Sequence, residues 1–134
     1  MLKRVLIANR GEIAIRIAKA AAALGTESVA VSAPADAHAL HTRFTTRSVQ
    51  IGVDNGTGID PVGAYLDSES LIRVAREAGC DSVHPGYGFL SESAKFADMC
   101  ASAGLTFIGP PPSVLSLFGD KVRARSFAHS IGVP

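Results

Sequence analysis

The stretch RVLIANRGEIAIR, residues 4–16, decides the fold. Residues 4–8 are a short apolar run of the kind found in strands that are buried on both faces. Asn9, Arg10 and Gly11 interrupt this run, and a helical pattern starts at Glu12. A buried strand that turns directly into a helix is the first half of a βαβ unit, so this stretch predicts a parallel sheet.

The helix after the turn is predicted over residues 12–24. Its apolar residues recur at helical spacing and are expected to form the buried stripe, which consists of Ile13, Ile17, Ala20, Ala21 and Leu24. Further strands are predicted over residues 27–32, 48–51, 81–84 and 105–108, and further helices over 68–78, 91–103, 113–118 and 120–130.

Two of these helices carry start signals. Asp67 is placed to cap the helix over residues 68–78, and Ser91 or Ser93 opens the next one. Segments 33–44 and 52–63 are expected to be loops, the first with one helical turn. The alternation of strands and helices predicts an α/β fold, a Rossmann-like parallel sheet flanked by helices on both faces.

Composition narrows the function. The chain has 134 residues, 47% of them hydrophobic, which suits one domain with a core of its own. Its formal net charge is +1, which gives no electrostatic basis for binding nucleic acid or an anionic membrane. No apolar run approaches the roughly 20 residues that cross a bilayer. We therefore expect no nucleic-acid partner and no membrane partner.

The cysteines and histidines do not form a metal pattern. Cys80 and Cys100 lack the paired spacing of a zinc site or a disulfide framework, so we expect two buried thiols in a reducing cytoplasm, and no metal ligands. His84 has no nearby cysteine or carboxylate at metal-site spacing and is expected to be structural. The remaining histidines, His38, His41 and His129, are expected at the surface or in linkers.

In a parallel sheet, ligands bind beyond the carboxyl ends of the strands, so the loops there matter most. The first, residues 9–12, holds one glycine where a dinucleotide-binding turn needs three, which argues against NAD or FAD. Asn9 and Arg10 either tie the strand end to neighbouring loops or contact a ligand.

Two later segments also leave alternatives open. In HPGYGFLSE, residues 84–92, Tyr87 lies between two glycines and either offers its ring and hydroxyl to a ligand or packs inward in a tight turn. Lys121 lies in the first turn of a helix, where its charge is unfavourable to the helix dipole. It either binds phosphate oxygens or is an ordinary exposed lysine, paired with Asp120 or not.

Taken together, these segments resemble the N-terminal domain of biotin carboxylases. The resemblance is carried by NRGEIAIR (9–16), ALH (39–41), HPGYGFLSE (84–92), FIGP (107–110) and GDK (119–121), in the same order and spacing over residues 1–134. The family's domain precedes an ATP-grasp domain, and the whole enzyme uses ATP and bicarbonate to carboxylate biotin, with Mg²⁺ on the phosphates.

The resemblance also implies roles for single residues. Lys121 corresponds to the family's N-domain lysine on the ATP phosphates. Tyr87 and Gly88 correspond to positions on the biotin side, and Arg16 and Lys19 to a helix face used for homodimer contacts. No catalytic residue is expected in this segment, because the metal carboxylates and the catalytic base lie downstream in similar enzymes.

The same resemblance sets the expected domain organisation. Residues 1–110 are expected to form the sheet core, and residues 111–134 a helical lead into an ATP-grasp domain. The chain is then a truncation at a domain boundary, inactive alone and with no cofactor bound. A biotin carboxyl carrier domain and the ATP-grasp domain are the expected partners, with a homodimer as a further assembly.

Some positions depart from the family pattern. TTRS, residues 45–48, replaces a usually acidic stretch, SAP (32–34) is unusual, and Ala23 stands where an acidic residue of the dimer face is common. Two other interpretations are a segment of a carbamoyl-phosphate synthase large subunit, although such chains lack the HPGYGFLSE string, and a stand-alone non-catalytic interaction module.

Overall fold

The computed structural model describes residues 1–52 and 61–133. Its centre is a sheet of five parallel strands in the order β3-β2-β1-β4-β5. The middle strand, β1 (Arg4–Ile7), pairs with β2 (Glu27–Ser32) on one side and with β4 (Ser82–His84) on the other. The edge strands are β3 (Arg47–Gln50) and β5 (Thr106–Phe107). The predicted parallel α/β sheet is confirmed.

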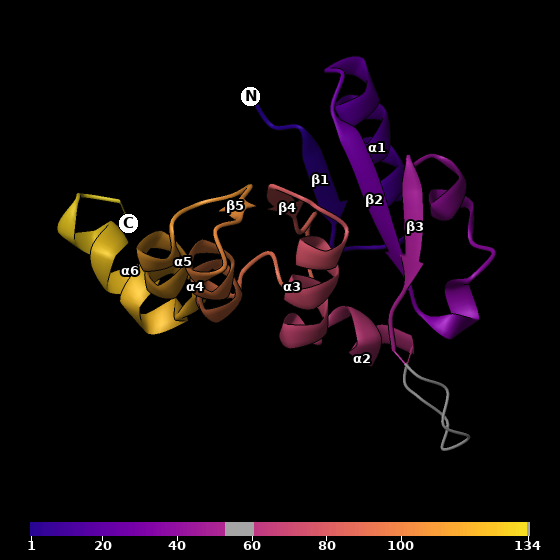
Figure 1. Cartoon of the computed structure of the whole chain (residues 1–134). Helices are drawn as coiled ribbons and strands as arrows, with labels where there is room; N and C mark the ends of the chain where they lie inside the picture. The colour runs from indigo at the N-terminus through magenta and orange to yellow at the C-terminus, as the bar shows by residue number, and fades with distance from the viewer. Residues whose placement is uncertain (53–60, 134) are drawn as a thin grey trace.

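Helices cover both faces of this sheet, as predicted. Along β1, Leu6 and Ala8 face the larger core, which α3 (Ser68–Glu77) and α4 (Ala94–Ser102) cover. Ile7 faces the smaller core beneath α1 (Gly11–Ala23). The alternation follows from the pleat, which turns successive side chains to opposite faces. Figure 1 shows α1 and α3 on opposite sides of the strands.

The predicted buried stripe of α1 is partly wrong. Ile17 and Ala21 are buried as expected, but Ala20 is exposed and Leu24 is 66% exposed. Ala14 and Ala18 are buried instead. On this face of the sheet β2 contributes the small side chains of Ser28, Ala30 and Ser32, so α1 packs against it through alanines. Ala20 and Leu24 instead line an open groove between α1 and the sheet.

The stretch between β2 and β3 is more ordered than predicted. It forms two short 3₁₀ helices, η1 (Pro34–Asp36) and η2 (Leu40–Arg43). His41 was expected at the surface or in a linker, and it lies in the connection between β2 and β3 but is not at the surface. Its side chain is 1% exposed, and Nε2 lies 2.9 Å from the carbonyl oxygen of Val31. This contact joins η2 to the strand before it, which explains why an imidazole is buried here.

The predicted loop over residues 52–63 needs a correction at its end. Pro61–Tyr65 forms a short helix, α2, that carries the buried Tyr65 into the core. Residues 53–60 lie outside the described residues.

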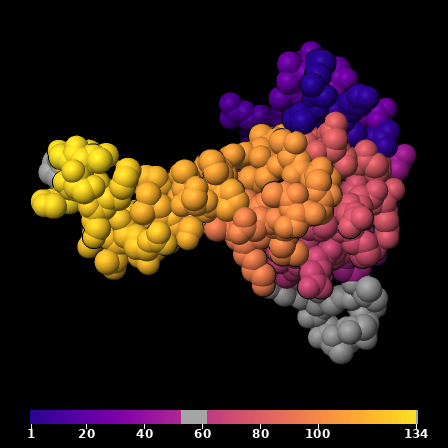
Figure 2. All heavy atoms as spheres, turned by 60° about the vertical axis from the view of Figure 1, so that its left-hand side comes forward, coloured from indigo at the N-terminus to yellow at the C-terminus, as the bar shows by residue number. Residues whose placement is uncertain are grey.

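The last two helices extend away from the sheet. α5 (Pro112–Gly119) buries one residue, Leu115, and α6 (Lys121–Ser130) buries none. Figure 2 shows this C-terminal part as an arm that projects from the body of the molecule. No helix among the described residues is long and apolar enough to cross a membrane.

Candidate functional site

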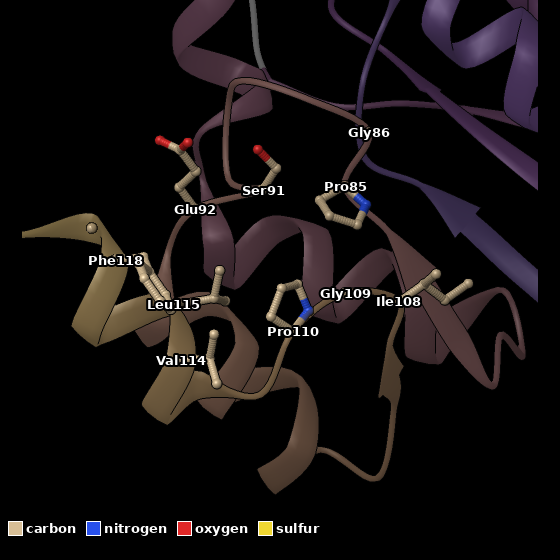
Figure 3. Close-up of a pocket in the computed structure, with 11 residues that line it drawn as sticks. Pro85, Gly86, Ser91, Glu92, Ile108, Gly109, Pro110, Val114, Leu115 and Phe118 are labelled. Atoms are coloured by element: carbon tan, nitrogen blue, oxygen red, sulfur yellow. The ribbon is translucent and has the colours of Figure 1, made fainter. Parts of the chain in front are cut away.

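A cavity of about 330 Å³ lies at the carboxyl ends of β4 and β5. One side is formed by the loop after β4, through Pro85, Gly86 and Ser91, and the opposite side by α5, through Val114 and Leu115 (Figure 3). Parallel sheets bind ligands at this edge. The cavity is therefore the candidate functional site of the described chain.

The loop after β4 has an unusual backbone. Gly86 and Gly88 have φ angles of +68° and +66°, and Phe89, which is not a glycine, has a φ of +45°. Such angles cost free energy for residues with a side chain and persist only where neighbouring structure fixes them. The two glycines of HPGYGFLSE are thus required by the turn.

Asn9 supplies much of that fixation. It is 1% exposed, and its Nδ2 donates to the carbonyl oxygens of Pro85 (2.8 Å) and Tyr87 (2.9 Å). Its Oδ1 accepts a hydrogen bond from the Arg10 amide at 2.8 Å. Of the two alternatives left open by the sequence, the structure shows the tie to a neighbouring loop.

Arg10 has a structural role as well. Its guanidinium pairs with Asp36 Oδ1 at 2.8 Å and lies 5.9 Å from the ring centre of Tyr65. The Tyr65 hydroxyl donates to Asp36 Oδ2 at 2.7 Å and accepts from the Ala33 amide. Burial, together with the hydrogen bond to Asp36, raises the pKa of Tyr65 above its usual range. Tyr65 therefore stays a neutral hydrogen-bond donor.

His84 is structural, as expected. Its Nδ1 accepts a hydrogen bond from the Gly86 amide at 3.0 Å. Burial of the ring lowers its pKa. An Nδ1 that accepts a hydrogen bond belongs to a neutral imidazole, and burial favours the same form. Through this bond His84 helps to fix the start of the loop.

The structure places Tyr87 and Gly88 on the outer part of this loop. The Tyr87 side chain is 70% exposed, so it does not pack inward. A Cβ built at Gly88 would meet no atom within 4 Å. Both positions are open to a ligand or to another part of a larger protein.

Lys121 begins α6 directly after the end of the cavity wall. Gly119 lines the cavity, and Asp120 caps α6 by accepting from the amides of Val122 and Arg123. Lys121 is exposed, and none of the ion pairs among the described residues includes it. Both capping bonds end on Oδ1 of Asp120, and none of the ion pairs among the described residues joins Asp120 to Lys121, so the structure does not show the alternative of an Asp120–Lys121 pair.

Arg16 and Lys19 are three positions apart on α1, and their side chains make different contacts. Arg16 lines an apolar groove of about 460 Å³ between α1 and the sheet, together with Ile13, Ala20 and Leu24. Lys19 Nζ lies 5.1 Å from the ring centre of Phe44, next to η2. The structure thus leaves Arg16 facing an uncovered apolar surface and gives Lys19 a contact within the chain.

The two thiols are not candidates for chemistry. Cys80 and Cys100 are unpaired and buried, and burial raises the pKa of each to about 11. Neither thiol therefore forms the reactive thiolate near neutral pH.

The described part of the chain holds no cluster of side chains that could bind a metal ion. Within residues 1–52 and 61–133, no three histidine, cysteine, aspartate or glutamate side chains gather where they could hold a metal ion.

Sequence reasoning missed the α5 wall of the cavity and the Asp36–Tyr65 pair. Val114, Leu115 and Phe118 look like ordinary helix residues, and nothing in their spacing shows which loop they will face. Asp36 and Tyr65 are 29 positions apart. The apolar run of α5 directly after three prolines was the only local signal for the wall.

Comparison with known proteins agrees with this geometry. The family described as biotin carboxylase, N-terminal domain, matches residues 1–115. Mitochondrial pyruvate carboxylase from Rattus norvegicus is 49% identical over 99% of this chain, which covers 11% of that protein. Biotin carboxylase from Halalkalibacterium halodurans is 44% identical over the whole chain, which covers 28% of that protein. The chain thus spans well under a third of these relatives.

Solved structures show the same fold. The biotin carboxylase domain of a single-chain bacterial carboxylase superposes with a TM-score of 0.91 at 55% identity, over 98% of this chain and 30% of that one. The biotin carboxylase domain dimer of 2-oxoglutarate carboxylase from Hydrogenobacter thermophilus, in complex with MgADP, ADP and bicarbonate, has a TM-score of 0.93 at 41% identity. That match covers the whole of this chain and 28% of the other. The match over residues 1–115 and the shared fold show that the chain belongs to the biotin carboxylase N-terminal domain family.

Proposed function

We propose that this domain works as part of an ATP-dependent biotin carboxylase, which phosphorylates bicarbonate and transfers the carboxyl group to biotin. The observation that carries the proposal is that two of the segments that resemble the family meet at one cavity. HPGYGFLSE forms one side of it, and the GDK segment follows directly from the other. A parent enzyme that binds ADP, Mg²⁺ and bicarbonate is supported by the Hydrogenobacter relative.

Within that reaction, the domain contributes binding groups and no catalytic residue. Lys121 is proposed to hold ATP phosphate oxygens through its ammonium group, which no residue of the described chain neutralises by an ion pair. Tyr87 and Gly88 are proposed to line the biotin side. Mg²⁺, which offsets phosphate charge when bound, is proposed to have its ligands in the remainder of the parent protein.

The proposed partners follow from the same assignment. α5 and α6 lead into an ATP-grasp domain, and a biotin carboxyl carrier domain delivers biotin to the loop after β4. Arg16 and Lys19 are proposed to contribute to a homodimer, supported by the domain dimer of the Hydrogenobacter relative. The unpaired thiols are compatible with the cytoplasm, which is the compartment we propose.

The Lys121→Gln variant of the parent protein tests the ATP assignment. Loss of a charge-assisted contact, worth about 1.5–3 kcal/mol, is expected to raise the KM for ATP roughly ten- to a hundredfold. Arg125→Gln removes the same charge from an exposed position of the same helix and is the matched control. Steady-state bicarbonate-dependent ATP hydrolysis measures both. An unchanged KM for ATP in Lys121→Gln, or an equal rise in Arg125→Gln, contradicts the assignment.

A further inference from the structure

We propose that Asn9 is a positioning residue for the biotin side of the site. Its carboxamide sets the conformation in which the loop of residues 85–91 presents Tyr87 and Gly88. This inference rests on the proposed function and assigns to that function a residue in the turn after β1, which does not line the cavity.

The first support is the way in which the sheet ends. The Ala8 amide still donates to the carbonyl oxygen of His84 at 2.9 Å, in the manner of the β1–β4 ladder. Beyond this bond the chain turns into α1, so the backbone of β1 no longer faces the backbone of the loop. The Asn9 side chain supplies the next donors, to Pro85 and Tyr87. The Asn9 side chain thus extends the hydrogen bonding between β1 and β4 beyond the last backbone bond.

The second support is that these two hydrogen bonds lie on either side of Gly86. A Cβ at residue 86 would lie 2.7 Å from Asn9 Nδ2, so the loop backbone packs directly against the carboxamide. The positive φ angles at Gly86, Gly88 and Phe89 follow in the next few residues. The positive φ of Phe89, which has a side chain, persists only where its surroundings fix the backbone. The Asn9 carboxamide, which holds the backbone on both sides of Gly86, contributes to that fixation.

The third support is the chemistry of the side chain. Both N–H groups of the Asn9 amide point at carbonyl oxygens, and its oxygen faces the Arg10 amide. Aspartate has the same shape but no such donors, and it would place a carboxylate oxygen against two carbonyl oxygens. A carboxamide at this buried position supplies both donors and the acceptor that the three partners need, and a carboxylate does not.

These contacts hold Tyr87 by its backbone and leave its side chain outside. The carbonyl oxygen of Tyr87 accepts from Asn9, while the ring is exposed. Replacing Asn9 therefore shifts the placement of Tyr87 and Gly88 without removing any group that would touch biotin.

The test uses the full-length protein that carries this domain, with free biotin as substrate. Asn9→Asp is expected to raise the KM for biotin at least tenfold and to change the KM for ATP less than twofold, because Lys121 is on another element. Gly86→Ala places a Cβ 2.7 Å from Asn9 Nδ2 and so disturbs the same contact from the loop. It is also expected to raise the KM for biotin at least tenfold and to change the KM for ATP less than twofold. It also serves as the second variant if Asn9→Asp does not fold.

Asp81→Asn is the matched control. Asp81 accepts hydrogen bonds from the amides of Lys3 (2.7 Å) and Arg4 (3.3 Å). These contacts join β1 and β4 at their amino ends, whereas Asn9 lies at their carboxyl ends. Its replacement weakens the fold without touching residues 85–91, so the KM for biotin is expected to stay within twofold of the wild-type value. An equal rise in the KM for biotin for Asn9→Asp and Asp81→Asn would overturn the proposal, because it would reflect general destabilisation.

Amide hydrogen exchange of residues 86–91 in the same proteins separates this inference from the proposed function. Exchange is expected to be at least tenfold faster in Asn9→Asp and unchanged in Asp81→Asn. An unchanged loop in Asn9→Asp overturns the role of Asn9, whatever the kinetics. A faster-exchanging loop with a wild-type KM for biotin instead overturns the assignment of Tyr87 and Gly88 to biotin.

Discussion

At the scale of single residues, short polar contacts decide the shape of the site. Asn9 and His84 each bond to the loop after β4, one through its side-chain donors and one through a ring acceptor. The sequence predicted a structural role for His84, because no cysteine or carboxylate lies near it at metal-site spacing, but it left the role of Asn9 open. It could not show that His41 is buried, since the partner of His41 is a backbone carbonyl that has no sequence signal.

The neutral state of His84 gives a pH dependence. Burial lowers its pKa below 6.5, so in the unfolded chain the ring takes up a proton near pH 6.5 while the folded ring does not. The free energy of unfolding is therefore expected to fall as the pH drops below 6.5, and this contribution levels off below the folded pKa. Denaturant unfolding between pH 5 and 8 measures it.

The His84→Asn variant provides the comparison for that measurement. Asparagine can accept the Gly86 amide through Oδ1 but does not titrate. The pH dependence of the wild type is expected to exceed that of the variant between pH 5 and 6.5, because the two proteins differ only at residue 84. Parallel curves for the two proteins would show that His84 has no part in the effect.

At the scale of elements, local signals predicted where helices begin, and tertiary packing decided which faces they bury. Asp67 and Ser93 cap α3 and α4 by accepting amides three residues ahead, as a cap residue does in most sequences. The buried face of α1 was mispredicted because it depends on β2, whose inner face accepts alanines. The sequence showed that residues recur at helical spacing, but the packing of α1 on the sheet decided which side of the helix is buried.

Two caps that look alike in sequence are expected to differ in effect. Asp67→Ala is expected to lower the free energy of unfolding by about 1 kcal/mol, because α3 buries Leu71, Val74 and Ala75 in the core. Asp120→Ala removes two hydrogen bonds, yet α6 buries nothing, so its fraying leaves the core intact. Urea unfolding of both variants tests this difference. Equal losses would mean that α6 unfolds together with the core.

At the scale of the whole molecule, the alternation of strands and helices was enough to predict a parallel sheet, but not its cavity. The cavity needs α5 to dock against the loop after β4, and that contact joins segments whose only sequence cues are prolines and a short apolar run. The roles proposed for Tyr87, Gly88 and Lys121 rest on the family resemblance, because no contact within the described chain points to them.

The isolated chain is expected to bind ATP very weakly. One charge-assisted contact at Lys121 contributes about 1.5–3 kcal/mol, which does not offset the roughly 4 kcal/mol or more that association costs. Calorimetric titration of the chain with MgATP should give no binding in the micromolar range, and biotin should behave in the same way. A micromolar Kd for ATP would show that this domain holds a complete nucleotide site.

The position of β1 at the centre of the sheet also matters during synthesis. β1 is synthesised before the other strands, and one of its edges can pair with β2 soon afterwards. Its other edge stays unpaired until β4 is synthesised, because Arg4 lies 77 positions before its partner Asp81. At about 5–20 residues per second on the ribosome, that edge stays open for roughly 4–15 s. An open, apolar strand edge is a template for wrong pairing. The nascent chain is therefore most in need of chaperone protection in the interval before β4 emerges.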